Sequence, residues 1–96
     1  MSKHNEKNIK QAIEELLETY KLKGRINEVR LVNSWERIMG KSISSHTREI
    51  HIANRTLYIR LDSAPLRHEL MFGKDKIIKL INEAVGESVI DDVVLK

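Results

Sequence analysis

The sequence predicts a small α+β domain with the element order helix, helix, strand, strand, helix, strand. Two helical apolar patterns occupy the first 39 residues, and regular alternation between residues 49 and 60 predicts a β-hairpin. A third helical pattern and a short apolar strand follow. The simplest architecture for this order is a three-stranded sheet with one open face and with the helices packed on the other face.

Two helices are expected before the sheet because apolar residues recur at three- and four-residue steps. The stripe of the first helix consists of Ile9, Ile13, Leu16, Leu17 and Tyr20. Gly24 is expected to end this helix in a left-handed conformation. The second helix is expected from Arg25 to Met39, where Gly40 stops it, and one further helical turn can follow. Its apolar face is expected to consist of Ile26, Val29, Val32, Trp35, Ile38 and Met39.

The hairpin register follows from a two-residue turn at Asn54-Arg55, where Asn tolerates a positive φ. This turn places four residue pairs opposite one another: Ile52–Leu57, Ile50–Ile59, His51–Tyr58 and Glu49–Arg60. The first two pairs lie on one face of the sheet and the last two on the other. A slip of one residue would mix apolar and polar side chains on both faces, so this register is predicted.

The third helix follows the hairpin directly. Asp62 or Ser63 can cap it, and Pro65 suits its first turn because the missing N–H has no intrahelical partner there. Gly73 is expected to kink this helix or to split it in two, and Gly86 ends it. Its apolar stripe consists of Leu66, Leu70, Ile77, Ile78 and Ile81. The segment SVIDDVVL then predicts a last strand, joined to the second strand by a right-handed crossover.

The length of 96 residues suits one domain, 1–96. Within it, residues 1–23 are expected to form an amphipathic helix that can act as a mobile arm, and residues 25–96 the core. The chain has no cysteine, and it has neither a signal-like N-terminus nor an apolar stretch long enough to span a membrane. We therefore expect a cytoplasmic protein that does not enter the membrane.

Positive charge is concentrated in the middle of the sequence. Residues 21–60 carry nine Lys and Arg against three Glu, whereas the segments before and after them are slightly acidic and the whole chain has a net charge of +3. A phosphate backbone would be attracted to such a region. An ordinary solvated surface is the alternative interpretation.

The sequence contains no recognisable catalytic motif. His46 and His51 are too far apart on an extended strand to hold one metal ion, Ser44, Ser45 and Ser63 lack an evident base, and the glycines are too scattered for a phosphate-binding loop. We therefore expect no catalytic residues, no metal, no other cofactor and no small-molecule substrate, which makes an enzyme improbable.

The open hairpin face is the candidate binding surface. Tyr58 can stack on a base while Arg55 and Arg60 contact phosphates, although a Tyr–His cross-strand pair also stabilises a solvated face without any ligand. The candidate nucleic-acid-binding residues are Lys41, Arg48, Arg55, Tyr58, Arg60 and Arg67. Trp35 is expected to be a core residue.

Between residue 29 and residue 96 the sequence resembles the DciA-like family. The matching positions are Trp35, Gly40, Ile43, His46, Thr47, Leu57, Ile59, Glu69, Leu70, Asn82 and Gly86. The resemblance implies a KH-like fold, DNA binding without enzymatic activity, and action with the bacterial replicative helicase. The chain has no GxxG, so it lacks the phosphate clamp of true KH domains. The alternatives are a protein-interaction module that uses the first helix or an exposed sheet edge, and an RNA-binding KH relative.

Overall fold

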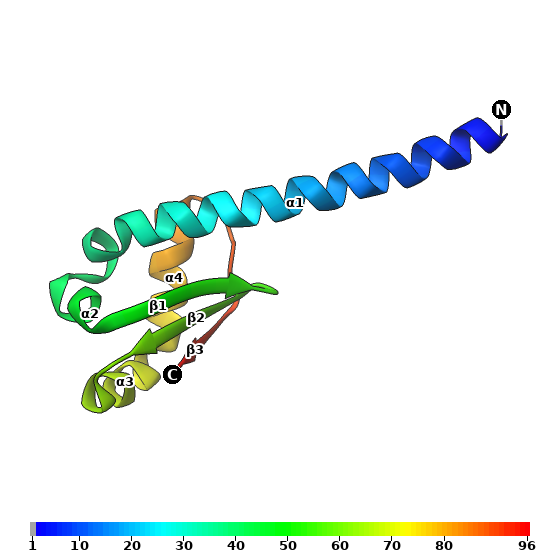
Figure 1. Cartoon of the computed structure of the whole chain (residues 1–96). Helices are drawn as coiled ribbons and strands as arrows, with labels where there is room; N and C mark the ends of the chain where they lie inside the picture. The colour runs from blue at the N-terminus through cyan, green and yellow to red at the C-terminus, as the bar shows by residue number, and fades with distance from the viewer. Residues whose placement is uncertain (1) are drawn as a thin grey trace.

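The computed structural model describes the backbone of residues 2–96 and the side chains of residues 8–96. Met1 and the side chains of residues 2–7, which belong to the predicted N-terminal arm, lie outside this description. The elements are α1 (Ser2–Met39), α2 (Lys41–His46), β1 (Thr47–Ala53), β2 (Thr56–Leu61), α3 (Ala64–Leu70), η1 (Met71–Gly73), α4 (Lys74–Val85) and β3 (Asp92–Leu95). The predicted α+β class and element order are confirmed (Figure 1).

Helix α1 is continuous, so the predicted helix end at Gly24 is wrong. A Cβ at Gly24 would meet no atom within 4 Å, and its φ is not positive. A glycine inside a helix costs only about 1 kcal/mol relative to Ala, and the helix-forming residues on both sides outweigh that cost. The helix ends instead at Gly40, whose φ of 88° is the conformation that glycine adopts most readily. The extra helical turn expected after it is α2.

The three strands form one sheet in the order β1-β2-β3, so β2 is central. The predicted hairpin register is confirmed at every pair from Glu49–Arg60 to Ala53–Thr56. Asn54 and Arg55 have φ values of 50° and 59°, as a tight two-residue hairpin turn requires. Strand β3 runs parallel to β2, with Tyr58 opposite Val94.

The segment between β2 and β3 follows the predicted outline. The Ser63 side chain accepts a hydrogen bond from the Leu66 backbone N–H at 3.3 Å, and Pro65 lies in the first turn of α3. The short helix η1 ends at Gly73 and separates α3 from α4, as the glycine predicted. Gly86 ends α4 in the left-handed conformation, with a φ of 86°.

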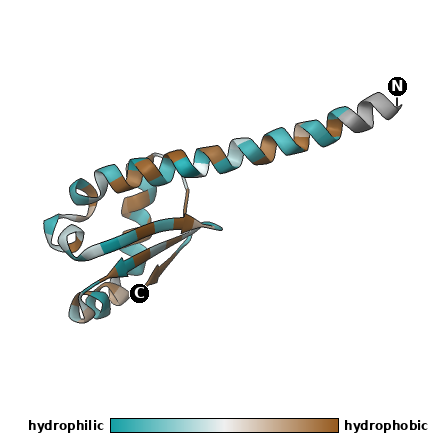
Figure 2. Ribbon diagram, in the orientation of Figure 1, coloured by the Kyte–Doolittle hydropathy of each residue, from teal (hydrophilic) through white to brown (hydrophobic). Residues whose placement is uncertain are grey.

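The core lies between the sheet and the helices α1 and α4 (Figure 2). Its fully or nearly fully buried residues are Leu31, Trp35, Leu57, Ile59, Leu61, Ile77, Ile81, Ile90 and Val93. Trp35 is a core residue as predicted, but Ile26, Val29 and Val32 are exposed, so that part of the predicted apolar face is wrong. The sheet and α4 instead pack on the face of α1 that carries Leu31 and Trp35. We use the name body for residues 27–96, which include this packed part of α1.

The N-terminal part of α1 projects away from the body, with no other element beside it (Figure 1). Every side chain from residue 8 to residue 26 is exposed. The radius of gyration is 17.4 Å, whereas a compact chain of this length would have about 12.5 Å. We use the name arm for residues 8–22 of α1. Whether the arm moves relative to the body stays a prediction.

Candidate nucleic-acid interface

The open face of the sheet brings together residues from all three strands. Tyr58 of β2 lies at its centre, opposite His51 of β1, and the two ring centroids are 6.2 Å apart with an interplanar angle of 32°. On the other side of Tyr58, the Lys96 ammonium group lies 5.2 Å from the centre of the tyrosine ring. Such a distance permits a cation–π interaction. The phenol ring is therefore held between an imidazole and a cation.

A hollow of about 290 Å³ lies on this open face. Its lining residues are Glu49, His51, Ala53, Tyr58, Ile59, Arg60 and Lys96. Alternation along the strands produces this arrangement, because successive side chains point to opposite faces. The hollow therefore combines an aromatic surface with two cations and one carboxylate.

Lys96 is a candidate that sequence reasoning missed. In β3, Val93 is fully buried, so Asp92 and Val94 face the open side, and Lys96 continues that alternation. The two adjacent acids, Asp91 and Asp92, leave the facing of this strand ambiguous in the sequence. The parallel register of β3 on β2 decides it, and this register depends on the tertiary structure.

Arg60 lies on the open face as expected, but it is paired with an acid. Its Nε lies 3.5 Å from Glu49 Oε2 on the neighbouring strand, and both side chains are about 60% exposed. An exposed pair of this kind contributes at most about 1 kcal/mol. A phosphate could therefore compete with Glu49 for the guanidinium at little cost.

Arg48 lies at an irregularity of β1, between Thr47 and Glu49, and its guanidinium contacts the Asp62 carboxylate. The second Asp62 oxygen lies 2.8 Å from His46 Nδ1. The His46 hydrogen bond, followed by the interactions with Arg48, holds the pKa of the Asp62 carboxyl below its usual value. Asp62, one of the two residues predicted to cap α3, therefore serves this cluster, and Ser63 supplies the cap.

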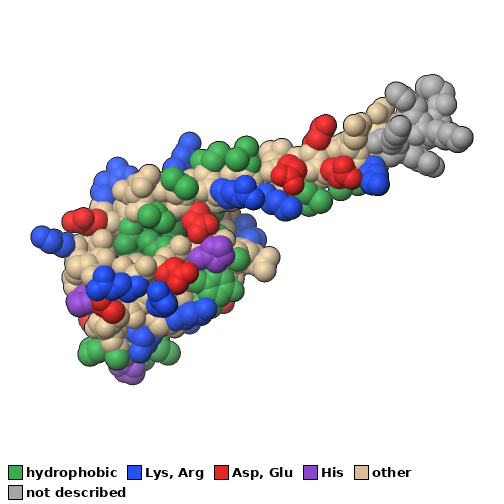
Figure 3. Space-filling view, viewed as in Figure 1, with side chains coloured by type: hydrophobic (Ala, Val, Ile, Leu, Met, Phe, Trp, Pro, Cys, Tyr) green, Lys and Arg blue, Asp and Glu red, His purple; other side chains and the backbone are tan. Residues whose placement is uncertain are grey.

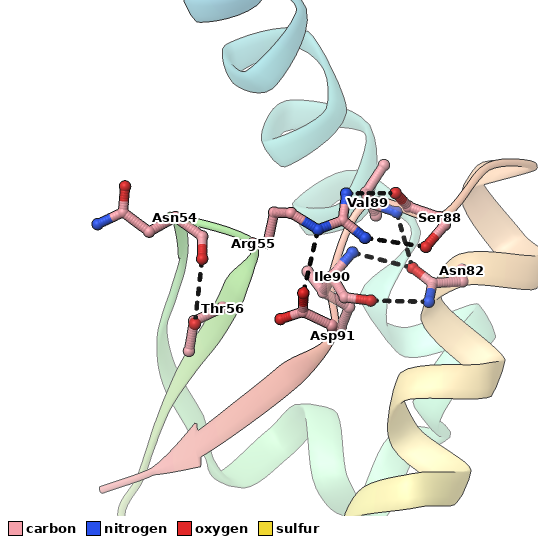
Figure 4. Close-up of polar contacts among 8 residues, drawn as sticks. All are labelled: Asn54, Arg55, Thr56, Asn82, Ser88, Val89, Ile90 and Asp91. Atoms are coloured by element: carbon pink, nitrogen blue, oxygen red, sulfur yellow. Dashed lines mark hydrogen bonds and ion pairs between the residues drawn. The ribbon is translucent and has the colours of Figure 1, made fainter.

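Arg55 fastens the hairpin turn to the loop between α4 and β3 (Figure 4). Its guanidinium donates to the Ser88 carbonyl oxygen at 2.9 Å and to the Ser88 hydroxyl at 3.0 Å, and its Nε lies 3.2 Å from Asp91 Oδ2. The Arg55 carbonyl oxygen accepts from the Asp91 backbone N–H at 2.8 Å. These contacts offset the cost of a positive φ at a residue other than glycine. Arg55 thus has a structural role, whatever it binds.

The two remaining candidates lie away from the open face. Lys41 is the exposed first residue of α2, and Arg67 is half-buried on α3. Neither has an ion pair with any side chain of residues 8–96. The structure therefore groups Tyr58 and Arg60 with Lys96, and the other candidates, Lys41, Arg48, Arg55 and Arg67, do not line that hollow.

The cations do not form one continuous patch. Ion pairs occupy Arg48, Arg55 and Arg60, and the same holds for Lys21 with Glu18 and Lys23 with Glu87. On the face visible in Figure 3, blue basic side chains lie interspersed with red acidic ones. Five of the nine basic residues between residues 21 and 60 are thus paired with acids, and three of these acids, Asp62, Glu87 and Asp91, lie outside the segment and are brought close by folding.

Asn82 fixes the loop that delivers β3 to the sheet (Figure 4). Its side-chain oxygen accepts from the backbone N–H groups of Val89 and Ile90 at 2.9 and 3.1 Å, and its amide donates to the Ile90 carbonyl oxygen at 2.9 Å. The loop backbone would otherwise lack partners, because it belongs to neither α4 nor β3. Asn82 therefore positions β3, and with it Lys96, on the open face.

Two further properties bear on function. Among the side chains of residues 8–96, no three histidine or acidic groups converge in the way that metal ligands do. None of the described helices is both long enough and apolar enough to cross a bilayer.

Comparison with known families matches residues 8–95 to the family described as "Dna[CI] antecedent, DciA". This match covers most of the chain and includes the arm as well as the body. The chain belongs to the DciA family. The resemblance inferred from Trp35, Gly40 and the hairpin is thereby confirmed. The DciA family is associated with helicase loading.

A relative of this DciA family member supports the assignment. The "UPF0232 protein" of Corynebacterium glutamicum (strain R) is 30% identical over 63 residues, which are 66% of this chain. The match covers only 35% of the relative, so the chain spans about a third of that protein's length.

Proposed function

We propose that this protein is a non-enzymatic, cytoplasmic DNA-binding accessory of bacterial replication, and that it binds DNA on the open face of its sheet. Membership of the DciA family supports the replication role. The observation that carries the proposed site is the hollow around Tyr58, because an aromatic ring beside Arg60 and Lys96 offers a base something to stack on and a phosphate something to contact.

The proposed mode is weak binding to single-stranded DNA. One base would stack on Tyr58, and the neighbouring phosphates would contact Lys96 and Arg60, which would exchange its Glu49 partner for a phosphate. Two phosphate contacts on a single strand would give a slope of about −1.4 for log affinity against log salt. The stacking of a base on Tyr58 would add a contribution to the affinity that salt does not remove.

Fluorescence anisotropy with a labelled single-stranded oligonucleotide tests this proposal. Arg60→Gln combined with Lys96→Gln should weaken binding at least tenfold. The matched control combines Lys76→Gln with Lys79→Gln on α4, which removes the same charge from exposed side chains off the sheet. Absence of binding by the wild type at low salt would overturn DNA binding, and equal losses in the two double variants would overturn the site.

Glu49 gives a test with the opposite sign. Glu49→Gln removes the acid that competes with phosphate for Arg60, so DNA affinity should rise several-fold. Glu36→Gln, an exposed acid on α1 without an ion pair among the described side chains, makes the same change in net charge and should raise affinity less. An unchanged affinity for Glu49→Gln would contradict the proposed role of Arg60. RNA of the same sequence should compete less well than DNA, and stronger competition would favour an RNA ligand.

The proposed protein partner is the replicative helicase. This part of the proposal is supported by the family alone. Co-purification of the untagged protein with purified, tagged replicative helicase from the same organism tests it. Failure to co-purify, with or without single-stranded DNA, would remove the helicase from the proposal and leave DNA binding standing.

A further inference from the structure

The arm exposes an apolar stripe that nothing in the described chain covers. Its members are Ile9, Ile13, Leu16, Leu17 and Tyr20, and each is between 53 and 64% exposed. Apolar residues recur along α1 from the body out into the arm (Figure 2). The arm comprises 15 residues, and a helix of about 15 residues without tertiary contacts is only marginally stable in water. A stripe of this size on such a helix is typical of a surface that is buried in an assembly.

The stripe continues the face of α1 that packs on the body. A four-residue step leads from Tyr20 to Gly24, and steps of three, four and four residues then reach Asn27, Leu31 and Trp35, all three of which are buried. Any helix that covers the stripe must therefore end where the body begins, near Asn27. At that point a hollow of about 710 Å³ lies between the base of the arm and the tip of the hairpin. It leaves room for the end of a second helix.

The charge of the arm disfavours an anionic partner. Residues 8–22 carry Lys10 and Lys21 against Glu14, Glu15 and Glu18, a small excess of acid. Figure 3 shows acidic side chains along the arm, with basic ones near both of its ends. Residues 8–22 therefore do not offer DNA or an anionic lipid surface the basic face by which both are recognised. The partner should instead be an amphipathic helix of similar polarity.

The residue spacing of the stripe suits antiparallel pairing with the same stripe of a second copy. Ile9, Ile13, Leu16 and Tyr20 are separated by four, three and four residues, and this series reads the same in both directions. In an antiparallel helix pair with its two-fold axis between Glu14 and Glu15, Ile9 meets Tyr20 of the second copy, and Ile13 meets Leu16. These are the layers of an antiparallel coiled coil. Leu17 lies at the edge, beside the aliphatic stem of Lys10 of the second copy.

We propose that the arm is a homodimerisation element, in which the arms of two copies of this chain pair antiparallel through Ile9, Ile13, Leu16 and Tyr20. Each stripe side chain exposes about 100 Å² of apolar surface. Two arms with five such side chains each would bury about 1,000 Å², which is near the lower limit for a specific interface. The dimer is therefore expected to dissociate on dilution. This proposal is independent of DNA binding.

Light scattering after size exclusion, over a range of concentrations, tests the dimer with the full chain. The wild type should approach twice the mass of one chain at high concentration. Ile13→Gln with Leu16→Gln should weaken dimerisation at least tenfold. The matched control, Leu22→Gln with Ile26→Gln, changes exposed apolar residues of the same helix outside the stripe and should leave it unchanged. A wild-type monomer at about 1 mM, or equal effects of the two double variants, would overturn the proposal.

Disulfide trapping tests the orientation, because the chain has no cysteine of its own. Ile13→Cys on a tagged chain and Leu16→Cys on an untagged chain should form a mixed disulfide when the two are combined and oxidised, since these positions face each other in the antiparallel pair. Each variant alone should cross-link weakly. Strong cross-linking of each variant with itself would indicate parallel helices and would refute the arrangement.

Discussion

Replacement of Asn82 by Ala should destabilise the domain more than any surface substitution of the same kind. The change removes three hydrogen bonds, which Asn82 makes to the backbone of Val89 and Ile90. Each is worth about 1 kcal/mol, so the loss is about 3 kcal/mol, and Ala regains about 0.5 kcal/mol of helix propensity. The net loss of about 2.5 kcal/mol is a large fraction of the stability of about 5–10 kcal/mol expected for a domain of this size.

Urea denaturation measured by fluorescence suits this test, because Trp35 is the only tryptophan and is buried. With a slope of about 1.2 kcal/mol per molar urea, the midpoint should fall by about 2 M. Asn33→Ala is the matched control, since Asn33 is an exposed residue of α1 with no side-chain hydrogen bond among the described residues. It should raise the midpoint slightly. A loss below about 1 kcal/mol for Asn82→Ala would refute the view that this side chain holds the loop in place.

Three further predictions concern single residues. Thr47→Val removes the acceptor of the Trp35 indole N–H, which lies 2.9 Å away, and the donor to the Ile43 carbonyl oxygen at 2.7 Å, so it should cost about 1–2 kcal/mol of unfolding free energy in urea. Gly24→Ala should raise the thermal midpoint because this residue lies within a helix, whereas Gly86→Ala should lower it because its φ is 86°. The pKa of the Asp62 carboxyl is lowered in the folded state. The ionised carboxylate therefore stabilises the fold fully above about pH 4, and this stabilisation is lost as the pH falls through the lowered pKa. Asp62→Asn should flatten this part of the stability–pH curve.

Controls sharpen these three tests. Thr19→Val makes the same chemical change as Thr47→Val, but the Thr19 hydroxyl donates only to its own helix backbone on an exposed surface, so little should change. A shift of the same sign for both glycine variants would contradict the conformations assigned to them. A wild-type stability curve that is flat between pH 2 and pH 4, or one that Asp62→Asn leaves unaltered, would show that the Asp62 cluster contributes nothing.

The hairpin was the part of the fold that local sequence could specify most completely. Alternation between residues 49 and 60 and the turn at Asn54-Arg55 predicted every observed pair from Glu49–Arg60 inward. Each of these pairs depends on residues close in sequence, and a slip of register would have exposed the apolar side chains. The split of the third helix at Gly73 and the helix stops at Gly40 and Gly86 are similarly local.

The errors arose where neighbouring or distant parts of the chain override a local signal. Gly24 was expected to end a helix, but a glycine inside a helix costs little free energy and the segments on both sides favour the helical state. Ile26, Val29 and Val32 were assigned to the core from their spacing, yet the sheet packs on a different side of α1. Periodicity shows that a helix has an apolar face; it does not show which face a neighbour will cover.

The candidate site illustrates the same division. Sequence alone placed Tyr58 and Arg60 on one face of a hairpin, because side-chain direction in a strand alternates with residue number. Lys96 joins them only through the parallel pairing of β3 on β2. The basic region expected from the sequence is partly neutralised by contacts between distant residues, such as the pair of Arg55 with Asp91, which is 36 positions away in the sequence.

By itself, the sequence determined the classes of the elements, their order, the hairpin register and the two glycine stops, because each follows from interactions within a few residues. Only the tertiary structure decided which face of α1 is buried, which cations are neutralised and where the last strand pairs. Those outcomes depend on distances between segments far apart in the chain, and on which acids folding brings beside each arginine. The exposed arm belongs to both: its stripe is visible in the sequence, and the absence of any cover over residues 8–26 is visible only in the fold.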